Sequence, residues 1–123
     1  MRNLGIPGFP EAKNFVLIDH RPGSVFRWLQ AVEVASLAFV VVDPVAFIPD
    51  YPVEQVRRAI AFCEIEDYEE IAVLAICSVP PAPDEPTANF LAPLGIGLRS
   101  RRGAQVILHD CGFDTRMTFL RGR

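Results

Sequence analysis

The chain has 123 residues, half of them hydrophobic, and a formal net charge of −3 at neutral pH. A chain of this length is expected to form one domain, residues 1–123, and to bury roughly two-thirds of its unfolded surface. The apolar content excludes a disordered chain. No apolar run is long enough to span a membrane, and no secretory signal is recognisable. We therefore expect a cytoplasmic protein with no membrane partner.

The N-terminal part predicts a loop followed by short strands. Residues 1–10 are rich in glycine and proline, and residues 15–18 form the first predicted strand. The segment 19–23 contains proline and glycine at turn positions. Residues 26–32 then form a second strand, which connects to a third through residues 33–36.

The third predicted strand, residues 37–42, is the longest unbroken apolar run in this region. Side chains alternate between the two faces of a strand, so both of its faces need cover, which is typical of a central strand. We expect Phe26, Trp28 and Phe39 to be the largest anchors of the core.

One amphipathic helix is predicted at about residues 52–63. Pro52 suits the first helical position, and Asp50 lies near the cap. Glu54 and Arg58 have the i,i+4 spacing of an ion pair. The apolar stripe expected to lie on the β core consists of Val53, Val56, Ile60 and Cys63.

The C-terminal half predicts further strands. Residues 71–79 form a long apolar strand, and the proline-rich segment 80–86 forms an exposed loop. Residues 87–98 form a strand interrupted by Pro93. A hairpin then leads into residues 104–108, and Met117, Phe119 and Leu120 mark a last strand. Six or seven strands with one helix predict a mainly β fold, a small antiparallel β-barrel-like domain.

No group of residues carries an enzyme or metal signature. The three cysteines are widely spaced and form no C-x-x-C pair, which argues against a zinc site or a disulfide framework. His109, Asp110 and Cys111 are the one cluster of acid, base and thiol, but a single i,i+2 pair is weak evidence for a nucleophile. We expect no catalytic residues, no metal and no cofactor.

Charge is unevenly distributed. Residues 33–70 are strongly acidic, with only Arg57 and Arg58 as cations, whereas residues 99–123 are rich in arginine. Such an arrangement would select partners by sign, or it is ordinary solvated surface. Net acidity, and the absence of aromatic and basic residues interleaved on one strand, argue against direct nucleic-acid binding.

A series of short segments follows one another along nearly the whole chain. They are Gly5-Ile-Pro-Gly-Phe9, Phe15-Val-Leu-Ile-Asp19, Phe26-Arg-Trp-Leu-Gln-Ala-Val32, Leu37-Ala-Phe-Val-Val-Val-Asp-Pro44, Pro49-Asp-Tyr51, Thr87-Ala-Asn-Phe-Leu-Ala-Pro93, Arg102-Gly103 and Gln105-Val-Ile-Leu108. Each segment is weak alone. In this order and with this spacing, they resemble the family of the flagellar assembly factor FliW.

The resemblance implies a non-enzymatic cytoplasmic protein with a small β-barrel-like fold and two partners, CsrA and flagellin. In the family, FliW holds CsrA and so relieves its repression of flagellin translation, and accumulating flagellin takes FliW and frees CsrA. Family members usually begin with an additional β-hairpin. We expect this chain to lack it, because Met1 stands almost directly before Gly5.

Two surfaces are candidates for partner binding. An RNA-binding partner should be basic, so we expect it to meet an acidic surface. The acidic candidates are Asp50, Glu64, Glu66, Asp67, Glu69 and Glu70. The second candidate surface combines Thr87 and Asn89 with the face of Gly95 and Gly97, where an extended partner segment would pair.

Alternatives remain for both surfaces and for the function. The acidic segment is otherwise a solvated loop, and Thr87 and Asn89 are otherwise hydrogen-bonded within the barrel. The alternative function is a small β-barrel domain that binds nucleic acid or a ligand, and a thiol enzyme is a third interpretation.

Overall fold

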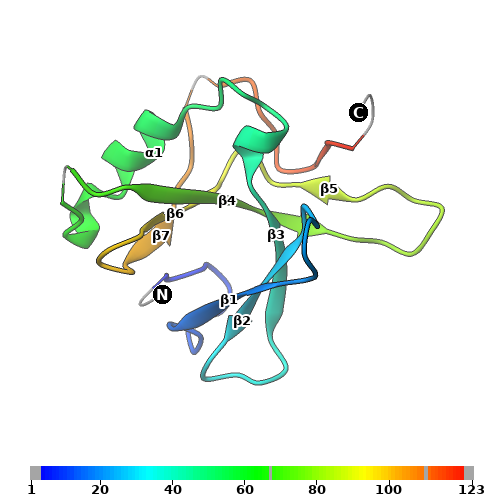
Figure 1. The fold of residues 1–123 in the computed structure, drawn as a ribbon, viewed down its shortest axis with the longest axis horizontal. Coiled ribbons are helices and arrows are strands. Elements are labelled where there is room, and N and C mark those ends of the chain that lie inside the picture. The colour runs from blue at the N-terminus through cyan, green and yellow to red at the C-terminus, as the bar shows by residue number, and fades with distance from the viewer. Residues whose placement is uncertain (1–3, 67, 110, 121–123) are drawn as a thin grey trace.

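A computed structural model of the chain describes residues 4–66, 68–109 and 111–120. In this part, strands form one antiparallel, curled sheet, a half-barrel with a single α-helix over it (Figure 1). The strands are β1 (Phe15–Asp19), β2 (Arg27–Ala31), β3 (Ala38–Val42), β4 (Ile71–Ser78), β5 (Thr87–Ala88), β6 (Leu94–Gly97), β7 (Gly103–Gln105) and β8 (Met117–Thr118). The mainly β prediction is confirmed, although the described residues contain eight strands, because the predicted strand 87–98 is divided into β5 and β6.

The sheet is organised around β4, which belongs to two ladders. Its first half, Ile71 to Leu74, pairs with β6, which in turn pairs with β7. Its second half pairs with β3 on one side and with β5 on the other. The chain therefore leaves one ladder after β5 and enters the other at β6, and Pro93 lies in this break, where a missing N–H disturbs no ladder.

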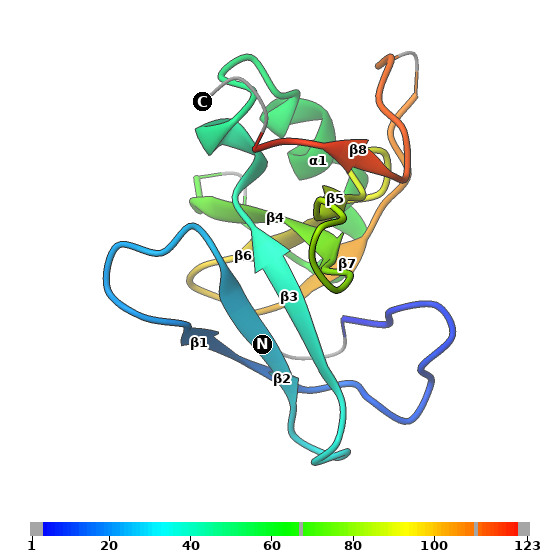
Figure 2. The same cartoon turned by 90° about the vertical axis from the view of Figure 1, so that its right-hand side faces the viewer.

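The edges of the main path are β1 and β8, at opposite ends of the order β1-β2-β3-β4-β5-β8. Figure 2 shows β1 and β2 at one end of the sheet and β8 beside β5 at the other. The strand β3 lies between β2 and β4, as expected for a central strand.

Both faces of β3 are covered. Val41 and Val42 are adjacent, point to opposite faces and are both fully buried. Val42 belongs to a core beneath the helix together with Val56, Ile60 and Phe90. Val41 belongs to a second core on the other face, where the N-terminal segment supplies Leu4, Ile6 and Ala12, β1 supplies Phe15 and β2 supplies Leu29.

The helix is shorter than predicted. The α-helix α1 spans Val53–Ala59, and a 3-10 turn, η2 (Ala61–Cys63), continues the chain after Ile60. Glu64 then adopts a left-handed conformation, with φ of 62°, which ends the helical path. A second 3-10 turn, η1 (Pro44–Ala46), follows β3. The predicted apolar stripe is confirmed, because all four of its residues pack in the core beneath the helix.

Two details of the predicted helix were wrong. Pro52 is the N-cap residue rather than the first helical residue, and although Asp50 lies two positions before it, no side chain caps the helix. Glu54 pairs with Arg57 at 3.5 Å rather than with Arg58, at the i,i+3 spacing that also brings side chains together on one helix face.

The predicted aromatic anchors also need correction. Trp28 is 39% exposed, whereas Phe26 and Phe39 are only half-buried, and the largest fully buried side chains are Phe15 and Phe90. The register explains this, because it places Trp28 opposite Val40 and not opposite Phe39. Trp28 and Phe39 therefore lie on opposite faces of the sheet.

None of the helices in the described ranges is long and apolar enough to cross a membrane.

Candidate partner-binding surface

The acidic segment that follows η2 is anchored by a buried carboxylate. Glu69 is only 3% exposed. Its Oε1 accepts hydrogen bonds from the main-chain N–H groups of Arg99, at 2.7 Å, and of Ser100, and its Oε2 accepts one from Glu66 at 3.2 Å. The guanidinium of Arg57 donates to the main-chain oxygen of Glu69 and so ties the segment to α1. Glu69 thus joins three parts of the chain.

These bonds explain the ionisation of Glu69. The main-chain N–H of Ser100, aided by Ser100's side chain and by the N–H groups of Arg99 and Glu66, lowers the pKa of this carboxyl against the opposing effect of burial. The structure therefore places Glu69, one of the predicted partner-binding residues, inside the fold rather than on the exposed surface. Its carboxylate accepts hydrogen bonds from main-chain N–H groups of the same chain and does not face solvent.

Around this buried anchor, the segment presents an exposed surface that we call the acidic–aromatic surface. Its members share high exposure and lie within ten residues of one another: Phe62, Glu64, Glu66, Tyr68 and Glu70. The aromatic side chains of Phe62 and Tyr68 are 74% and 71% exposed, respectively. Neither aromatic was among the residues predicted from the sequence. The available signal was that Phe62 lies off the apolar stripe of the helix and Tyr68 lies between acids.

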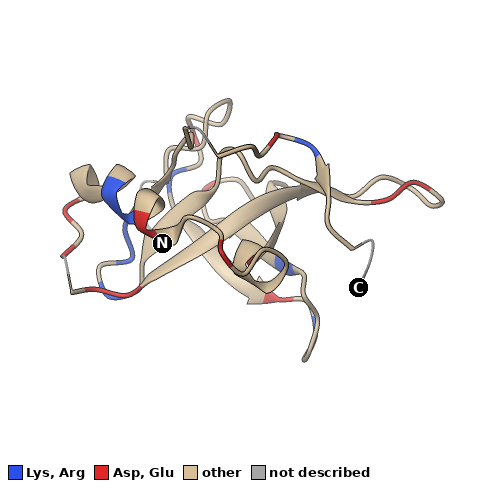
Figure 3. Ribbon diagram, turned by 90° about the horizontal axis from the view of Figure 1, so that it is seen from above, with Lys and Arg blue, Asp and Glu red and all other residues tan. Residues whose placement is uncertain are grey.

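Arginines of the hairpin between β6 and β7 border this surface. The Arg99 guanidinium donates to the Tyr68 hydroxyl at 3.2 Å and lies 5.8 Å from the centre of its ring, a cation–π contact. Arg102 forms an ion pair with Glu64. Figure 3 shows the acidic segment and this hairpin side by side at one end of the molecule. Glu64 of the acidic middle and Arg102 of the basic C-terminal part therefore meet here, so the two regions are not wholly separate surfaces.

The remaining acidic candidates do not join this surface. Asp50 is exposed but precedes α1, whereas the acidic segment follows it, so the length of the helix, about 10 Å, separates them. Asp67 lies outside the described residues. Glu64, Glu66 and Glu70 are the predicted acids that the structure brings together in exposed positions.

The second predicted surface is covered. A Cβ at Gly95 would lie 2.6 Å from Cγ1 of Val56, and a Cβ at Gly97 would lie 2.7 Å from Oε1 of Glu69. The face without side chains therefore receives α1 and the buried carboxylate, so the prediction that an extended partner segment pairs there was wrong. Close approach requires these glycines, but the approaching groups belong to the same chain.

Thr87 and Asn89 also have structural positions within the fold. Asn89 Oδ1 accepts a hydrogen bond of 2.9 Å from the Ala92 N–H, and the Asn89 N–H donates to the main-chain oxygen of Ile76. Thr87 is half-buried in β5, between β4 and β8. The alternative of internal hydrogen bonding holds for Asn89, which stabilises the turn where the chain leaves one ladder for the other.

The thiols and histidines form no reactive arrangement in the described residues. Cys111 packs against the core that contains Tyr51, whereas His109 is exposed, and Asp110 lies outside the described residues. Burial raises the pKa of Cys63 and raises the pKa of Cys77 to about 12, so both remain thiols at neutral pH. Among the described side chains, no group of three or more His, Cys, Asp or Glu is placed to hold a metal ion.

Comparison with known proteins identifies the family. The family model described as "FliW protein" matches residues 3–119. The flagellar assembly factor FliW of Caldanaerobacter subterraneus subsp. tengcongensis is 40% identical over 107 residues, which make up 86% of this chain and 71% of that protein. The flagellar assembly factor FliW of Bacillus subtilis is 33% identical over 112 residues, 91% of this chain and 78% of that protein.

A solved structure agrees with these relatives. The crystal structure of a flagellar assembly factor FliW superposes with a TM-score of 0.77 and 31% sequence identity, covering 96% of this chain and 82% of that one. Sequence and fold therefore point to the same conclusion over nearly the whole chain: it belongs to the FliW family of flagellar assembly factors.

Proposed function

We propose that this chain is a non-enzymatic, cytoplasmic regulator of flagellar assembly that binds the translational repressor CsrA. Binding relieves the repression of flagellin translation, and flagellin competes as the second partner. The observation that carries this proposal is the match to the FliW family over residues 3–119. In this proposal the protein acts by binding either CsrA or flagellin, and binding alone requires no reaction centre and no cofactor.

The acidic–aromatic surface supports this function, and we assign CsrA to it. An RNA-binding protein carries basic surface, and complementary charge speeds association and orients the partners. Glu64, Glu66 and Glu70 supply negative charge, and the exposed rings of Phe62 and Tyr68 supply apolar contact area. Exposed aromatic side chains are enriched at the energetically dominant positions of protein interfaces.

Competition between the two partners gives the regulatory output. A protein that holds CsrA only while flagellin is scarce couples translation to flagellin supply through mass action alone. This logic requires that the two partners cannot be bound at once. It does not require that flagellin use the same side chains as CsrA.

The direct test measures binding to CsrA and flagellin from the same host. Isothermal titration of the purified chain should detect binding to CsrA, and added flagellin should displace CsrA. Failure to bind either protein would contradict the proposal. Retention of the chain on single-stranded RNA in the absence of CsrA would favour a nucleic-acid-binding domain instead.

Charge reversal tests the assignment of CsrA to the acidic–aromatic surface. The double variant Glu66→Lys/Glu70→Lys should weaken CsrA binding by about tenfold at low salt and flatten its salt dependence, since two attractive charges become repulsive. The matched control is Glu11→Lys/Asp84→Lys, which changes the net charge equally at exposed positions in other loops. Equal affinities of the two double variants would remove CsrA from this surface.

A further inference from the structure

The acidic–aromatic surface is already in contact with cations of its own chain. Arg102 forms an ion pair with Glu64. The Arg99 guanidinium donates to the Tyr68 hydroxyl at 3.2 Å and lies 5.8 Å from the centre of the Tyr68 ring. A carboxylate and an aromatic face are the groups that a basic partner would contact with its own lysines and arginines. The hairpin between β6 and β7 therefore holds two of these groups before any partner arrives.

The hairpin keeps these cations close to the surface, although each contact is weak. Its main chain is fixed, because the Arg99 N–H donates to the buried carboxylate of Glu69 and the Gly97 N–H donates to the Arg102 oxygen. The paired side chains are open to water, with Arg102 44% and Glu64 79% exposed. An exposed ion pair contributes little stability, so a partner can break it. Because the cation is attached to the same chain, it re-forms the pair readily.

The other exposed acids of the surface are differently placed. Within the part of the chain that the structure describes, the carboxylates of Glu66 and Glu70 take part in no ion pair. A basic partner can meet these two carboxylates directly. Glu64, in contrast, must first release Arg102.

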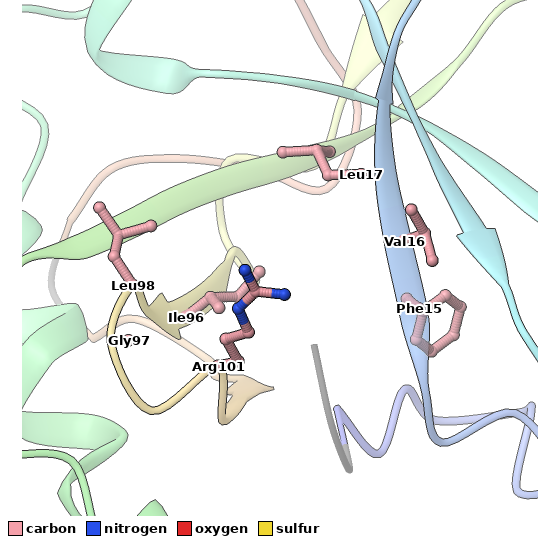
Figure 4. Close-up of a pocket in the computed structure, with 7 residues that line it drawn as sticks. All are labelled: Phe15, Val16, Leu17, Ile96, Gly97, Leu98 and Arg101. Atoms are coloured by element: carbon pink, nitrogen blue, oxygen red, sulfur yellow. The ribbon is translucent and has the colours of Figure 1, made fainter.

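The third arginine of the hairpin does not face this surface. Arg101 lines a pocket together with Phe15 and Leu17 of β1, and Figure 4 shows its guanidinium extending toward β1. Arg101 has the same charge as its two neighbours and lies between them in the sequence, so it is a matched control for a local effect of Arg99 and Arg102.

We propose that Arg99 and Arg102 are internal competitors of CsrA, which binds the acidic–aromatic surface by replacing Arg102 on Glu64 and Arg99 on Tyr68 with its own cations. Both arginines also repel those cations, so the hairpin lowers the affinity of the complex. This inference rests on the proposed function, which takes CsrA as the basic partner. An affinity limited in this way leaves CsrA displaceable by flagellin.

Neutralising either competitor should strengthen binding. Arg102→Gln and Arg99→Gln should each tighten the binding of CsrA roughly two- to fivefold at low salt, as expected for the loss of one exposed competing contact. Arg101→Asn removes the same charge with a residue that tolerates the left-handed backbone at this position, φ 60°, and should change the affinity less than either. Isothermal titration of the full chain with CsrA from the same host gives the affinities.

A double-mutant cycle separates competition at a contact from a general effect of charge. In a Glu64→Gln background, Arg102→Gln should tighten binding less than it does when Glu64 is present, because no ion pair remains to be exchanged. Equal gains in the two backgrounds would reduce the effect to net charge and would overturn the inference. The main-chain hydrogen bonds of the hairpin do not involve the substituted side chains, so the thermal midpoint should stay nearly unchanged.

The outcomes distinguish this inference from the function on which it rests. If the unsubstituted chain binds CsrA and neither Arg99→Gln nor Arg102→Gln binds more tightly, the proposed function stands and the inference is overturned. If neither the unsubstituted chain nor any variant binds CsrA, the proposed function fails and the inference fails with it. Binding that becomes detectable only in the Arg99 or Arg102 variants would support both.

Discussion

Oε1 of Glu69 lies 2.7 Å from the main-chain nitrogen of Arg99, thirty positions further along the chain. This contact fixes the hairpin between β6 and β7 against the loop that follows α1. The hairpin carries Arg99 and Arg102 toward the acidic–aromatic surface. A single buried carboxylate thus holds together the two segments that form and border the acidic–aromatic surface.

Replacing Glu69 should therefore disturb folding and the acidic–aromatic surface together. Glu69→Ala leaves the buried N–H groups of Arg99 and Ser100 without their acceptor, which is costly away from water. We expect the thermal midpoint to fall by several degrees, measured by circular dichroism. Glu66→Ala removes an exposed carboxylate three residues earlier and should leave the midpoint nearly unchanged.

The decrease in the free energy of unfolding at acidic pH should depend on Glu69 and Glu33. Hydrogen bonds from Asn14, first from its main-chain N–H and then from its side chain, and from the Lys13 N–H lower the pKa of Glu33 to about 2. The pKa of Glu69 is lowered by the Ser100 N–H. A carboxyl with a lowered pKa in the folded state contributes stability that is fully present above its unfolded pKa. That contribution is lost as the pH falls through its folded pKa.

Urea unfolding between pH 6 and about 2.5 measures this loss. Glu33→Gln and Glu69→Gln should each lower stability at neutral pH and flatten its decline below the ordinary carboxyl pKa. Glu11→Gln, a change in the exposed turn before β1, should leave the slope as it is. An unchanged slope in both test variants would show that other groups control acid unfolding.

Gly95→Ala should destabilise the protein by about 1–3 kcal/mol, because an added methyl group overpacks the contact with α1. The new Cβ would lie 2.6 Å from Cγ1 of Val56 and 3.1 Å from Cδ1 and Cγ2 of Ile60. Val56→Ala removes the closest of these atoms. The double variant should be more stable than the sum of the single effects predicts, measured by chemical denaturation in a double-mutant cycle. Simple additivity would contradict a direct contact between Gly95 and Val56.

Tyr51→Phe should cost about 1–2 kcal/mol, because it leaves the buried main-chain oxygen of Phe90 without its donor. The Tyr51 hydroxyl donates to this oxygen, and Tyr51 is only 4% exposed. Burial raises the pKa of Tyr51, so its hydroxyl remains protonated and able to donate at neutral pH. Tyr68→Phe, at an exposed hydroxyl, is the comparison variant, and both are measured by urea unfolding.

The exposed aromatics should matter for binding and not for folding. Phe62→Ser/Tyr68→Ser should keep the thermal midpoint and weaken CsrA binding by about tenfold or more, because truncating central aromatic residues typically removes most interface energy. Val79→Ser, directly after the end of β4 and 56% exposed, is the control. Unchanged CsrA affinity in the double variant would place the partner elsewhere.

Patterns of apolar residues within single segments correctly predicted the central strand β3 and the buried face of α1, because those features depend on neighbouring residues in the sequence. The apolar run at 37–42 has no polar face, so β3 had to be central, and the stripe of Val56 and Ile60 had to pack on a core. The length of α1 was less predictable, because the helical path changes to a 3-10 turn after Ile60 and ends where Glu64 turns left-handed, and the acidic sequence indicates neither change. Family resemblance rested on many short segments in order, and it required no tertiary information.

The sequence by itself determined the mainly β class, the central strand, the apolar face of the helix and the family. Only the tertiary structure decided that Trp28 is partly exposed, that Glu69 is buried and that the small face of Gly95 and Gly97 is filled from within. The physical reason is register. Which side of a strand meets which neighbour depends on hydrogen bonds between residues that are tens of positions apart, and composition within a segment does not contain that information.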